Sequence, residues 1–312
     1  MNSEEINRLF INTIGRNANE DEVKQFRDSG MSSVRMKRMI LRSNINIVQP
    51  IRQERKVRRK KTERVPQQNT QVVRSYSVNN KHWKDFCRDN LEKIRKFFYL
   101  EPLVDSKNHA ILSVFEKSEC VEFVLRNMLV KLMGNWKLSI VCHRDLKPYI
   151  KDMIKDISTE IEIISVSHEK YNKNMLDKNF WKNLKGDKIL CMTPDTVIFN
   201  ENVEDFLHYD YIGAPWKYKL KGTFVGDGKL SLRTRKIMMD ILENFEPQTF
   251  LSEDVFFSST MLKHNIGKLA SAEQALLFSY KDTKVDNTVG GSMIWRSNNG
   301  VVNENEVLEK VL

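Results

Sequence analysis

The chain has 312 residues, of which 40% are hydrophobic, and this length suits one large domain or a large domain with a small one. No apolar run approaches the length of a membrane span, and the first ten residues lack the pattern of a signal peptide, so we expect a cytoplasmic protein. The four cysteines show neither a CxxC pair nor a metal-ligand spacing, so we expect reduced thiols and no structural zinc.

The formal net charge of +10 is concentrated in the first quarter of the chain. Residues 1–80 contain 17 Lys and Arg and 8 Asp and Glu, whereas the other 232 residues contain 34 and 33. Eight of those basic residues lie in RQERKVRRKKTER, residues 52–64. Such a run is typical of a solvated linker and less often binds nucleic acid or an anionic membrane. We favour the linker, because no aromatic residues are interleaved to stack on bases.

Residues 1–45 are predicted to form a small all-helical domain. Apolar residues at helical spacing indicate one helix in residues 4–15, Asn19 indicates the N-cap of a second, and SSVRMKRMILRS (32–43) indicates a third. The stretch RLFINTIGRNANEDEVKQF resembles a small helical repeat known only as a domain of unknown function, and this resemblance implies no chemistry. Residues 46–80 are rich in Gln, Asn, Ser and charge, so we expect a basic linker.

Residues 81–312 follow a different pattern, in which short apolar runs alternate with helical segments. After an initial helix, the predicted strands are 109–115, 136–142, 161–166 and 187–192, and the helices between them are 121–134, 146–157 and 179–186. Nearly all-apolar strands alternating with helices indicate an α/β fold with a mostly parallel sheet and helices on both faces. Ligands bind beyond the carboxyl ends of such strands. The polar residues at those ends are Glu116, His143, Ser167 and Thr193–Asp195.

The letters HRDLKP at residues 143–148 match the catalytic loop of protein kinases, but their context excludes that class. A kinase needs an asparagine five residues after the aspartate, where this chain has Ile150, and the chain contains no DFG. Only three glycines precede the motif, and they form no glycine-rich loop. We interpret HRDLKP as a strand-end loop that runs into a helix, with Pro148 near its first turn.

Three later segments contain residues suited to a sugar-nucleotide site, each with a structural alternative. Asp195 in TPDTVIF is either a turn residue or a group that meets a diphosphate. Trp216 closes EDFLHYDYIGAPW and either fills a gap in the core or stacks on a sugar. Glu253 and Asp254 open an apolar helix, where they either complement the helix dipole or supply a general base.

The stretch FVGDGKLSLRTRK (224–236) places Gly226 and Gly228 on either side of Asp227, before a predicted strand and a basic helix. Glycine beside a short strand indicates a hairpin turn or a backbone that another group approaches closely. The fragment alone leaves both interpretations open.

The order and spacing of these segments resemble a family of glycosyltransferase-like domains of otherwise unassigned function. Its members typically show YDYIGAPW, VGNGGFSLRS and EDV, which here are YDYIGAPW, VGDGKLSLRT and EDV. The resemblance covers about residues 108–295 and extends more distantly to GT-A galactosyltransferases. It implies a GT-A-like, Rossmann-like domain over residues 81–312 that moves a sugar from a nucleotide-sugar donor to an acceptor hydroxyl.

The resemblance also implies roles for individual residues. Asp254 would be the general base of an inverting displacement, with Glu253 beside it. The donor nucleotide and its diphosphate would be bound by Glu116, Arg126, Thr193, Asp195 and Lys229. The pocket for the sugar and the acceptor would be lined by Trp216, Gly226, Asp227 and Gly228. Asp195 would also hold a manganese or magnesium ion on the diphosphate.

Three positions depart from the family pattern. Asp227 replaces an asparagine, Lys229 replaces a second glycine, and Ser292 or Met293 stands where relatives often have a histidine. A lysine at 229 either pairs with the diphosphate or obstructs the loop. Because Asp195 is the only acid of the usual Asp-x-Asp pair, a metal would need help from substrate phosphates. Two alternatives remain: a degenerate protein that binds a nucleotide or sugar without turnover, and a nucleic-acid-associated or membrane-associated protein that acts through its first 80 residues.

Overall fold

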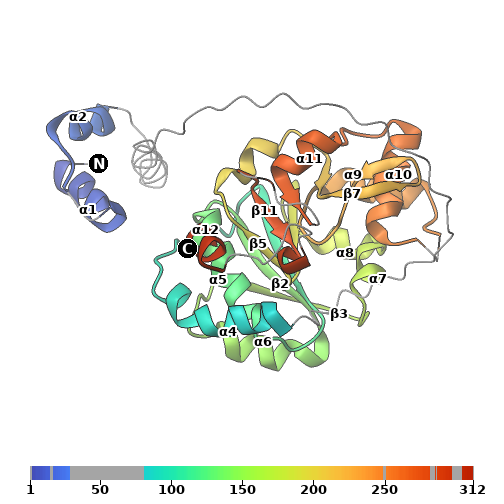
Figure 1. Cartoon of the computed structure of the whole chain (residues 1–312), viewed down its shortest axis with the longest axis horizontal. Helices are drawn as coiled ribbons and strands as arrows, with labels where there is room; N and C mark the ends of the chain where they lie inside the picture. The colour runs from blue at the N-terminus through green and yellow to red at the C-terminus, as the bar shows by residue number, and fades with distance from the viewer. Residues whose placement is uncertain are drawn as a thin grey trace. The chain divides into compact units, whose positions relative to one another are not determined.

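A computed structural model describes residues 2–14, 17–28, 81–248, 251–281, 285, 287–296 and 304–311. The chain divides into two compact units, Met1–Thr70 and Gln71–Leu312 (Figure 1). The predicted third helix (32–43), the predicted linker (46–80) and its basic run (52–64) lie outside the described residues.

The Met1–Thr70 unit contains two described helices, α1 (Ser3–Ile14) and α2 (Glu20–Asp28). Asn19 precedes α2, and its side-chain oxygen accepts the backbone N–H of Glu22 at 2.8 Å. The Glu22 carboxylate in turn accepts the backbone N–H of Asn19, also at 2.8 Å. This reciprocal pair satisfies two amides that a helix start leaves unpaired. The N-cap predicted at Asn19 is therefore confirmed.

The Gln71–Leu312 unit is built on a six-stranded sheet with the order β3-β2-β1-β4-β9-β6. The bounds are β1 (Asn108–Val114), β2 (Lys137–His143), β3 (Glu162–Val166), β4 (Lys188–Met192), β6 (Tyr211–Gly213) and β9 (Ser231–Thr234). The first four strands run parallel to one another, and β9 is antiparallel to both β4 and β6. The mostly parallel sheet expected from the sequence is confirmed.

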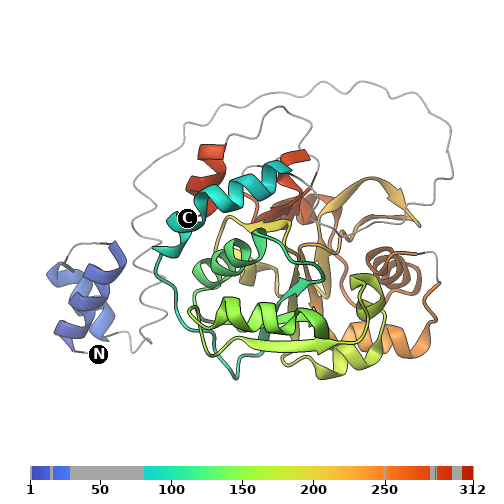
Figure 2. The same cartoon turned by 90° about the horizontal axis from the view of Figure 1, so that it is seen from below.

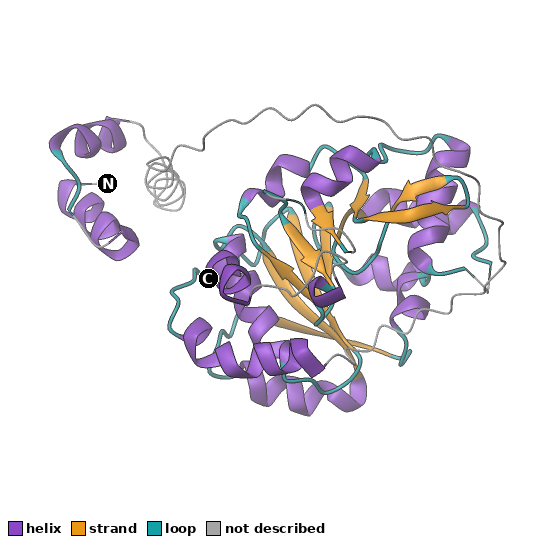
Figure 3. Ribbon diagram, viewed as in Figure 1, coloured by secondary structure: helices purple, strands orange, loops and turns teal. Residues whose placement is uncertain are grey.

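Helices cover both faces of this sheet (Figures 2 and 3). Their bounds are α4 (Lys81–Arg95), α5 (Cys120–Leu132), α6 (Lys147–Ile154), α7 (Tyr171–Met175), α8 (Lys178–Asn183), α9 (Arg235–Asn244), α10 (Glu253–His264), α11 (Ala272–Phe278) and α12 (Glu304–Val311). Along β1, Ala110 and Leu112 join a core that contains residues of α4 and α5, while Ile111 joins a second core with residues of α8 and α10. Alternate side chains of a strand point to opposite faces, so a nearly all-apolar strand fills both cores.

Two smaller sheets adjoin the main one. The strands β5 (Thr196–Ile198), β10 (Ser279–Tyr280) and β11 (Gly290–Ser292) form one, and β7 (Pro215–Leu220) and β8 (Thr223–Val225) form a hairpin. The short 3-10 helices are Arg144–Leu146, Asn202–Phe206 and Ile294–Arg296. Within the described ranges, no helix combines the length and the apolar character that crossing a membrane requires.

Candidate functional site

The carboxyl end of β4 and the start of β9 meet at one edge of the main sheet. Antiparallel pairing sets Cys191 opposite Ser231, so the residues just after β4 lie close to those just before β9. The first of these loops contains Asp195, and the second contains residues 226–229. The helix α10 packs against β8 and begins with Glu253. The pairing of β4 with β9 therefore brings the predicted site segments together.

Asp195 is buried and forms an ion pair with the side-chain ammonium of Lys229, which lies 34 residues later. The second carboxylate oxygen of Asp195 accepts a hydrogen bond from the Thr193 hydroxyl at 2.5 Å. Its backbone oxygen accepts the N–H of Met293 at 2.9 Å. Because only 2% of Asp195 is exposed, this residue is half of a buried ion pair and not an open turn residue.

A second buried ion pair lies next to the first. The ammonium of Lys281 is 2.5 Å from one carboxylate oxygen of Asp227, a partner 54 residues away. The other oxygen of Asp227 accepts the backbone N–H of Lys229 at 3.3 Å. The short segment from Asp227 to Lys229 thus contributes an anion to one pair and a cation to the other.

The third pair joins Arg233 on β9 to Glu253 at the start of α10. Two guanidinium nitrogens of Arg233 donate to the two carboxylate oxygens of Glu253 at 2.5 and 3.0 Å, and the third donates to Ser231 at 2.9 Å. Neither member of the pair is exposed. The guanidinium carbon lies 4.7 Å from the centre of the Tyr211 ring, which adds a cation–π contact. This pair fixes the first turn of α10 to the sheet.

The charged groups of these residues influence one another's protonation, as the pKa of Glu253 shows. Burial raises the pKa of Glu253 to about 7, while the Arg233 guanidinium opposes that rise and the negative charges of Asp254 and Asp227 add to it. The acids of residues 227, 253 and 254 therefore form one electrostatic cluster, although they were predicted from separate motifs.

Asp254, at the start of α10, faces residues 226–229, the glycine loop. Its two carboxylate oxygens accept the backbone N–H groups of Gly228 at 3.3 Å and of Val255 at 2.9 Å. The Ser258 hydroxyl donates to the backbone oxygen of Asp254 at 2.7 Å, one turn further along the helix. Asp254 is buried, and these contacts orient its carboxylate toward the loop that the sequence singled out.

The two glycines of that loop are needed for close packing. A Cβ on Gly228 would overlap the Glu253 carboxylate and lie 2.8 Å from a guanidinium nitrogen of Arg233. Gly226 has a φ of +137°, which side chains resist, and a Cβ there would lie 2.8 Å from Ser258 and 3.1 Å from the Trp216 ring. The loop therefore lets its own backbone approach the buried pair. Trp216 itself is buried behind Gly226 and presents no open face to a sugar.

Buried polar atoms without partners lie near Asp195. The hydroxyl of Ser292 and the indole nitrogen of Trp295 have no hydrogen-bond partner among the described residues. The ring of Trp295 stacks on that of Trp83 at 5.5 Å, and the Trp83 indole nitrogen donates to the backbone oxygen of Pro194 at 2.8 Å. Since buried polar groups are nearly always hydrogen-bonded, these atoms are places for a polar ligand or for water.

The donor set around Asp195 does not fit the divalent metal that the resemblance implied. One carboxylate oxygen of Asp195 meets the Lys229 ammonium and the other accepts the Thr193 hydroxyl, whereas magnesium and manganese need several oxygen ligands. In the part of the chain that the structure describes, no three His, Cys, Asp or Glu side chains are placed to hold a metal ion.

Two residues predicted to bind the donor, Glu116 and Arg126, take no part in the three buried ion pairs. Glu116 is exposed in the loop after β1, the strand that pairs with β4, so it lies at the same edge of the sheet. Arg126 donates to Glu122 at 2.9 Å within α5, and Glu122 also pairs with Arg95 of α4 at 2.8 Å. These contacts tie two helices together, and the donor-binding role of Arg126 stays a prediction.

The sequence reasoning missed Arg233 and Lys281 as members of the site. A signal existed for Arg233, because in the predicted strand LSLR it alternates with leucines and shares a strand face with Ser231, next to the glycine loop. No local pattern marks Lys281, which follows the two-residue strand β10.

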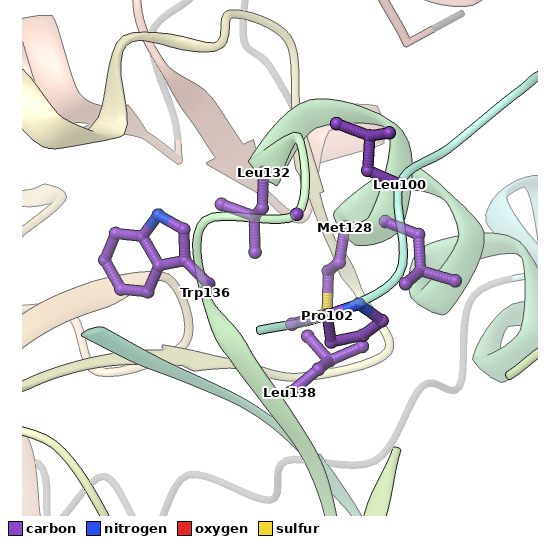
Figure 4. A pocket seen from close by; sticks show the side chains of 8 residues that line it. Leu100, Pro102, Met128, Leu132, Trp136 and Leu138 are labelled. Atoms are coloured by element: carbon purple, nitrogen blue, oxygen red, sulfur yellow. The ribbon is translucent and has the colours of Figure 1, made fainter. Parts of the chain in front are cut away.

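A separate pocket lies away from these residues, between α5 and the start of β2 (Figure 4). Its lining is apolar: Leu100, Pro102, Met128, Leu129, Leu132, Gly134, Trp136 and Leu138. Ligand sites usually add a few polar groups that orient the ligand. This pocket supplies no charged side chain, so the candidate site is the ion-paired edge of the sheet.

Residues 155–289 match the model of a family described as a protein of unknown function, DUF5672. This range contains all three ion pairs and Asp254. A comparison with curated proteins finds no significant match.

Solved structures similar to this chain include three transferases of low identity. The 4-diphosphocytidyl-2C-methyl-D-erythritol synthase of Anaerococcus prevotii is 11% identical, with a TM-score of 0.38 over 55% of this chain and 94% of its own. The inositol-1-phosphate CTP transferase of T. maritima is 9% identical, with a TM-score of 0.44 over 69% and 98%. The mannosyltransferase PcManGT of Pyrobaculum calidifontis, in complex with GDP-Man and Mn2+, is 9% identical, with a TM-score of 0.42 over 70% and 66%. We draw no functional argument from likenesses this low.

Proposed function

We propose that the Gln71–Leu312 unit is a GT-A-like glycosyltransferase that binds a nucleotide sugar at the edge of the sheet where β4 ends. The observation that carries the proposal is the convergence of Asp195, Lys229 and Asp254 around one glycine loop. These residues come from three segments that the sequence associated with one chemistry, and they meet beyond the carboxyl ends of parallel strands, where α/β folds bind ligands.

In this proposal the donor diphosphate meets Lys229 and Lys281. An ammonium group has three N–H donors, so each lysine can keep its carboxylate partner and still donate to a phosphate oxygen. The Ser292 hydroxyl and the Trp295 indole nitrogen, which lie near Asp195 without hydrogen-bond partners among the described residues, can donate further hydrogen bonds to the nucleotide sugar. The glycine loop then allows the backbone to lie against the transferred sugar.

Asp254 is the proposed general base. Its carboxylate accepts the proton of the acceptor hydroxyl while the acceptor oxygen bonds to the anomeric carbon of the sugar. The bond from that carbon to the diphosphate breaks, and its electron pair leaves with the nucleoside diphosphate. Glu253 is less suited to this role, because its carboxylate is neutralised by the Arg233 guanidinium, whereas the oxygens of Asp254 accept only neutral backbone N–H groups among the contacts given above.

A second candidate is a protein that binds a nucleotide sugar without turnover. The near-complete burial of Asp254, of which 1% is exposed, favours it, since a general base must come within hydrogen-bond reach of the acceptor.

One experiment separates these functions. UDP-sugars and GDP-sugars are screened against the full chain by thermal shift. For each nucleotide sugar that binds, its hydrolysis to the free sugar and the nucleoside diphosphate is then followed with the unmodified protein and with two variants. We expect Asp254→Asn to keep the thermal shift and to lose turnover by about 10²- to 10⁴-fold. The control is Asp240→Asn, which removes a partly exposed carboxylate of α9 that pairs with Lys236.

The possible results have distinct meanings. Binding with turnover that Asp254→Asn leaves unchanged would remove Asp254 from the mechanism. Binding without turnover would favour the second candidate, and the absence of a shift with every nucleotide sugar would refute both.

A further inference from the structure

The hairpin formed by β7 and β8 begins and ends at the candidate site. Its second residue is Trp216, which packs behind the glycine loop, and Gly226 of that loop directly follows β8. The hairpin turns at Lys221 and Gly222, whose φ angles are +50° and +92°. Two successive left-handed residues give the tight turn that suits the twist of a two-stranded ribbon. The ribbon is therefore continuous with the site at both of its ends.

The middle of β7 is exposed over three consecutive residues. Lys217, Tyr218 and Lys219 are consecutive and all exposed, whereas Trp216 before them is buried. These residues lie where the pairing of β7 with β8 is irregular, between Pro215 and Leu220, so the strict alternation of a regular strand does not hold there. On β8 the alternation holds, because Phe224 is exposed and its neighbours Thr223 and Val225 are buried.

Two aromatic rings are exposed on this ribbon. Tyr218 is 69% exposed and Phe224 is 40% exposed. The ammonium of Lys217 lies 5.6 Å from the centre of the Tyr218 ring, and that of Lys219 lies 5.2 Å from the centre of the Phe224 ring. Each ring is thus paired with a cation, and a ligand that stacks on the ring meets the positive charge at the same time.

The charged residues of the ribbon itself are all basic. Residues 211–226 contain three lysines and no aspartate or glutamate. The hairpin turn approaches the end of α10, since a Cβ on Gly222 would lie 3.8 Å from a methyl group of Leu262. Leu262 is exposed and is followed by Lys263 and His264. The basic and aromatic surface therefore extends from the ribbon to the end of α10.

We propose that this surface, which we name the hairpin surface (Lys217, Tyr218, Lys219, Lys221 and Phe224), binds an anionic saccharide chain as the acceptor. The rings stack on the C–H faces of the sugars, and the ammonium groups pair with their carboxylate, sulfate or phosphate groups. Nucleic acid would also meet rings and cations. We choose a saccharide because the surface leads directly into a site proposed for sugar transfer, and the inference rests on that proposed function.

Binding of a carboxylated polysaccharide, polygalacturonate, to the full chain tests the inference. Dextran is the uncharged comparison, and a single-stranded oligonucleotide represents the competing class. We expect polygalacturonate to bind with an affinity that falls as salt rises, and dextran to bind far more weakly. A variant with Tyr218→Ala and Phe224→Ala should bind polygalacturonate about three- to tenfold more weakly, because two stacking contacts are lost.

A charge-matched pair of variants completes the test. One variant changes Lys217, Lys219 and Lys221 of the hairpin surface to Gln, and the other, the α6 variant, changes Lys147 and Lys151 of α6 and Lys155 directly after it to Gln. Both lose three exposed lysines, so the amount of charge lost is the same and its place differs. We expect at least about tenfold weaker polygalacturonate binding for the hairpin variant and little change for the α6 variant.

Equal losses in the two lysine variants, or tighter binding of the oligonucleotide than of polygalacturonate, would overturn the inference. Nucleotide-sugar binding is measured alongside. If a nucleotide sugar binds and polygalacturonate does not, the acceptor assignment fails and the transferase proposal stands. If polygalacturonate binds at the hairpin and no nucleotide sugar binds, the surface stands and the transferase proposal fails.

Discussion

The ion pair between Arg233 and Glu253 offers the sharpest test of how the candidate site is held together. Changing Glu253 to Gln keeps the shape of the side chain and removes its charge, which leaves the Arg233 guanidinium unpaired in the core. Because neither partner is exposed and two hydrogen bonds of 2.5 and 3.0 Å join them, we expect the free energy of unfolding at pH 8, where Glu253 is ionised, to fall by about 3–5 kcal/mol. That is about a third to a half of the roughly 10 kcal/mol that stabilises a typical domain.

The reverse change, Arg233→Met, should cost less and should depend on pH. A guanidinium cannot lose its proton, whereas an unpaired carboxyl can gain one. Burial already raises the pKa of Glu253 to about 7 in the folded chain, above its ordinary 4.5. The folded state therefore holds the proton of Glu253 more tightly than the unfolded state does. Protonation of Glu253 thus favours folding, and this contribution is complete below pH 4.5 and is lost as pH rises through 7. Without Arg233 the pKa rises further, and we expect a smaller cost at pH 5.5 than at pH 8.

Urea unfolding followed by circular dichroism measures both single variants and the double variant Arg233→Met with Glu253→Gln. The two residues contact each other directly, so the double variant should lose at least about 2 kcal/mol less than the sum of the single losses. Additive losses, or a loss below about 1 kcal/mol for Glu253→Gln, would show that the pair does not hold α10 to the sheet. The reasoning that separates a structural Glu253 from a catalytic Asp254 would then fail.

Three further outcomes follow from the same structure. Gly228→Ala should lower the free energy of unfolding by about 1–3 kcal/mol in urea titrations, because its new methyl group would overlap the Glu253 carboxylate, and an unchanged midpoint would contradict the packing described. Asp195→Asn should cost about 3 kcal/mol or more, since it leaves the Lys229 ammonium buried without its charge partner, and a loss near zero would show that the pair is not formed. Burial lowers the pKa of His109 to about 4 from 6.5, so its neutral form contributes about 3 kcal/mol that is present above pH 6.5 and is lost as pH falls through 4. The variant His109→Asn should lack this part of the acid dependence in urea titrations from pH 7 to pH 4, and parallel pH profiles for the two proteins would contradict the assignment.

Local sequence patterns predicted much of the fold. The strands and helices predicted between residues 108 and 192 are all present in the predicted order, with ends that differ by a few residues, and the structure adds the short helix α7, which was not predicted. The predicted strand and basic helix after the glycine loop are β9 and α9. What the alternation could not foresee is the place of β9, which lies antiparallel between β4 and β6. Periodicity reports whether a strand is buried, and it carries no information on which strand becomes its neighbour.

For the candidate site too, local patterns predicted one part and the tertiary structure decided the other. The residue types that gather at the edge of the sheet were identified from motifs, but their partners were not. The family resemblance implied a metal ion at Asp195, with help from substrate phosphates, whereas the folded chain gives this carboxylate the ammonium of Lys229 as its cation. For Trp216 the sequence left two roles open, filling a gap in the core or stacking on a sugar, and the structure buries it behind Gly226.

The sequence by itself determined the α/β pattern of the larger unit, the cap of α2 and the positions of the acids at strand and helix ends. Each of these depends on residues a few positions apart, and the energies involved act locally. Only the tertiary structure decided the three ion pairs, whose members are separated by 34, 54 and 20 residues. A buried charge is stable only with an opposite charge within hydrogen-bond distance, and which charge comes that close is set by the pairing of β9 with β4 and the packing of α10 against the sheet.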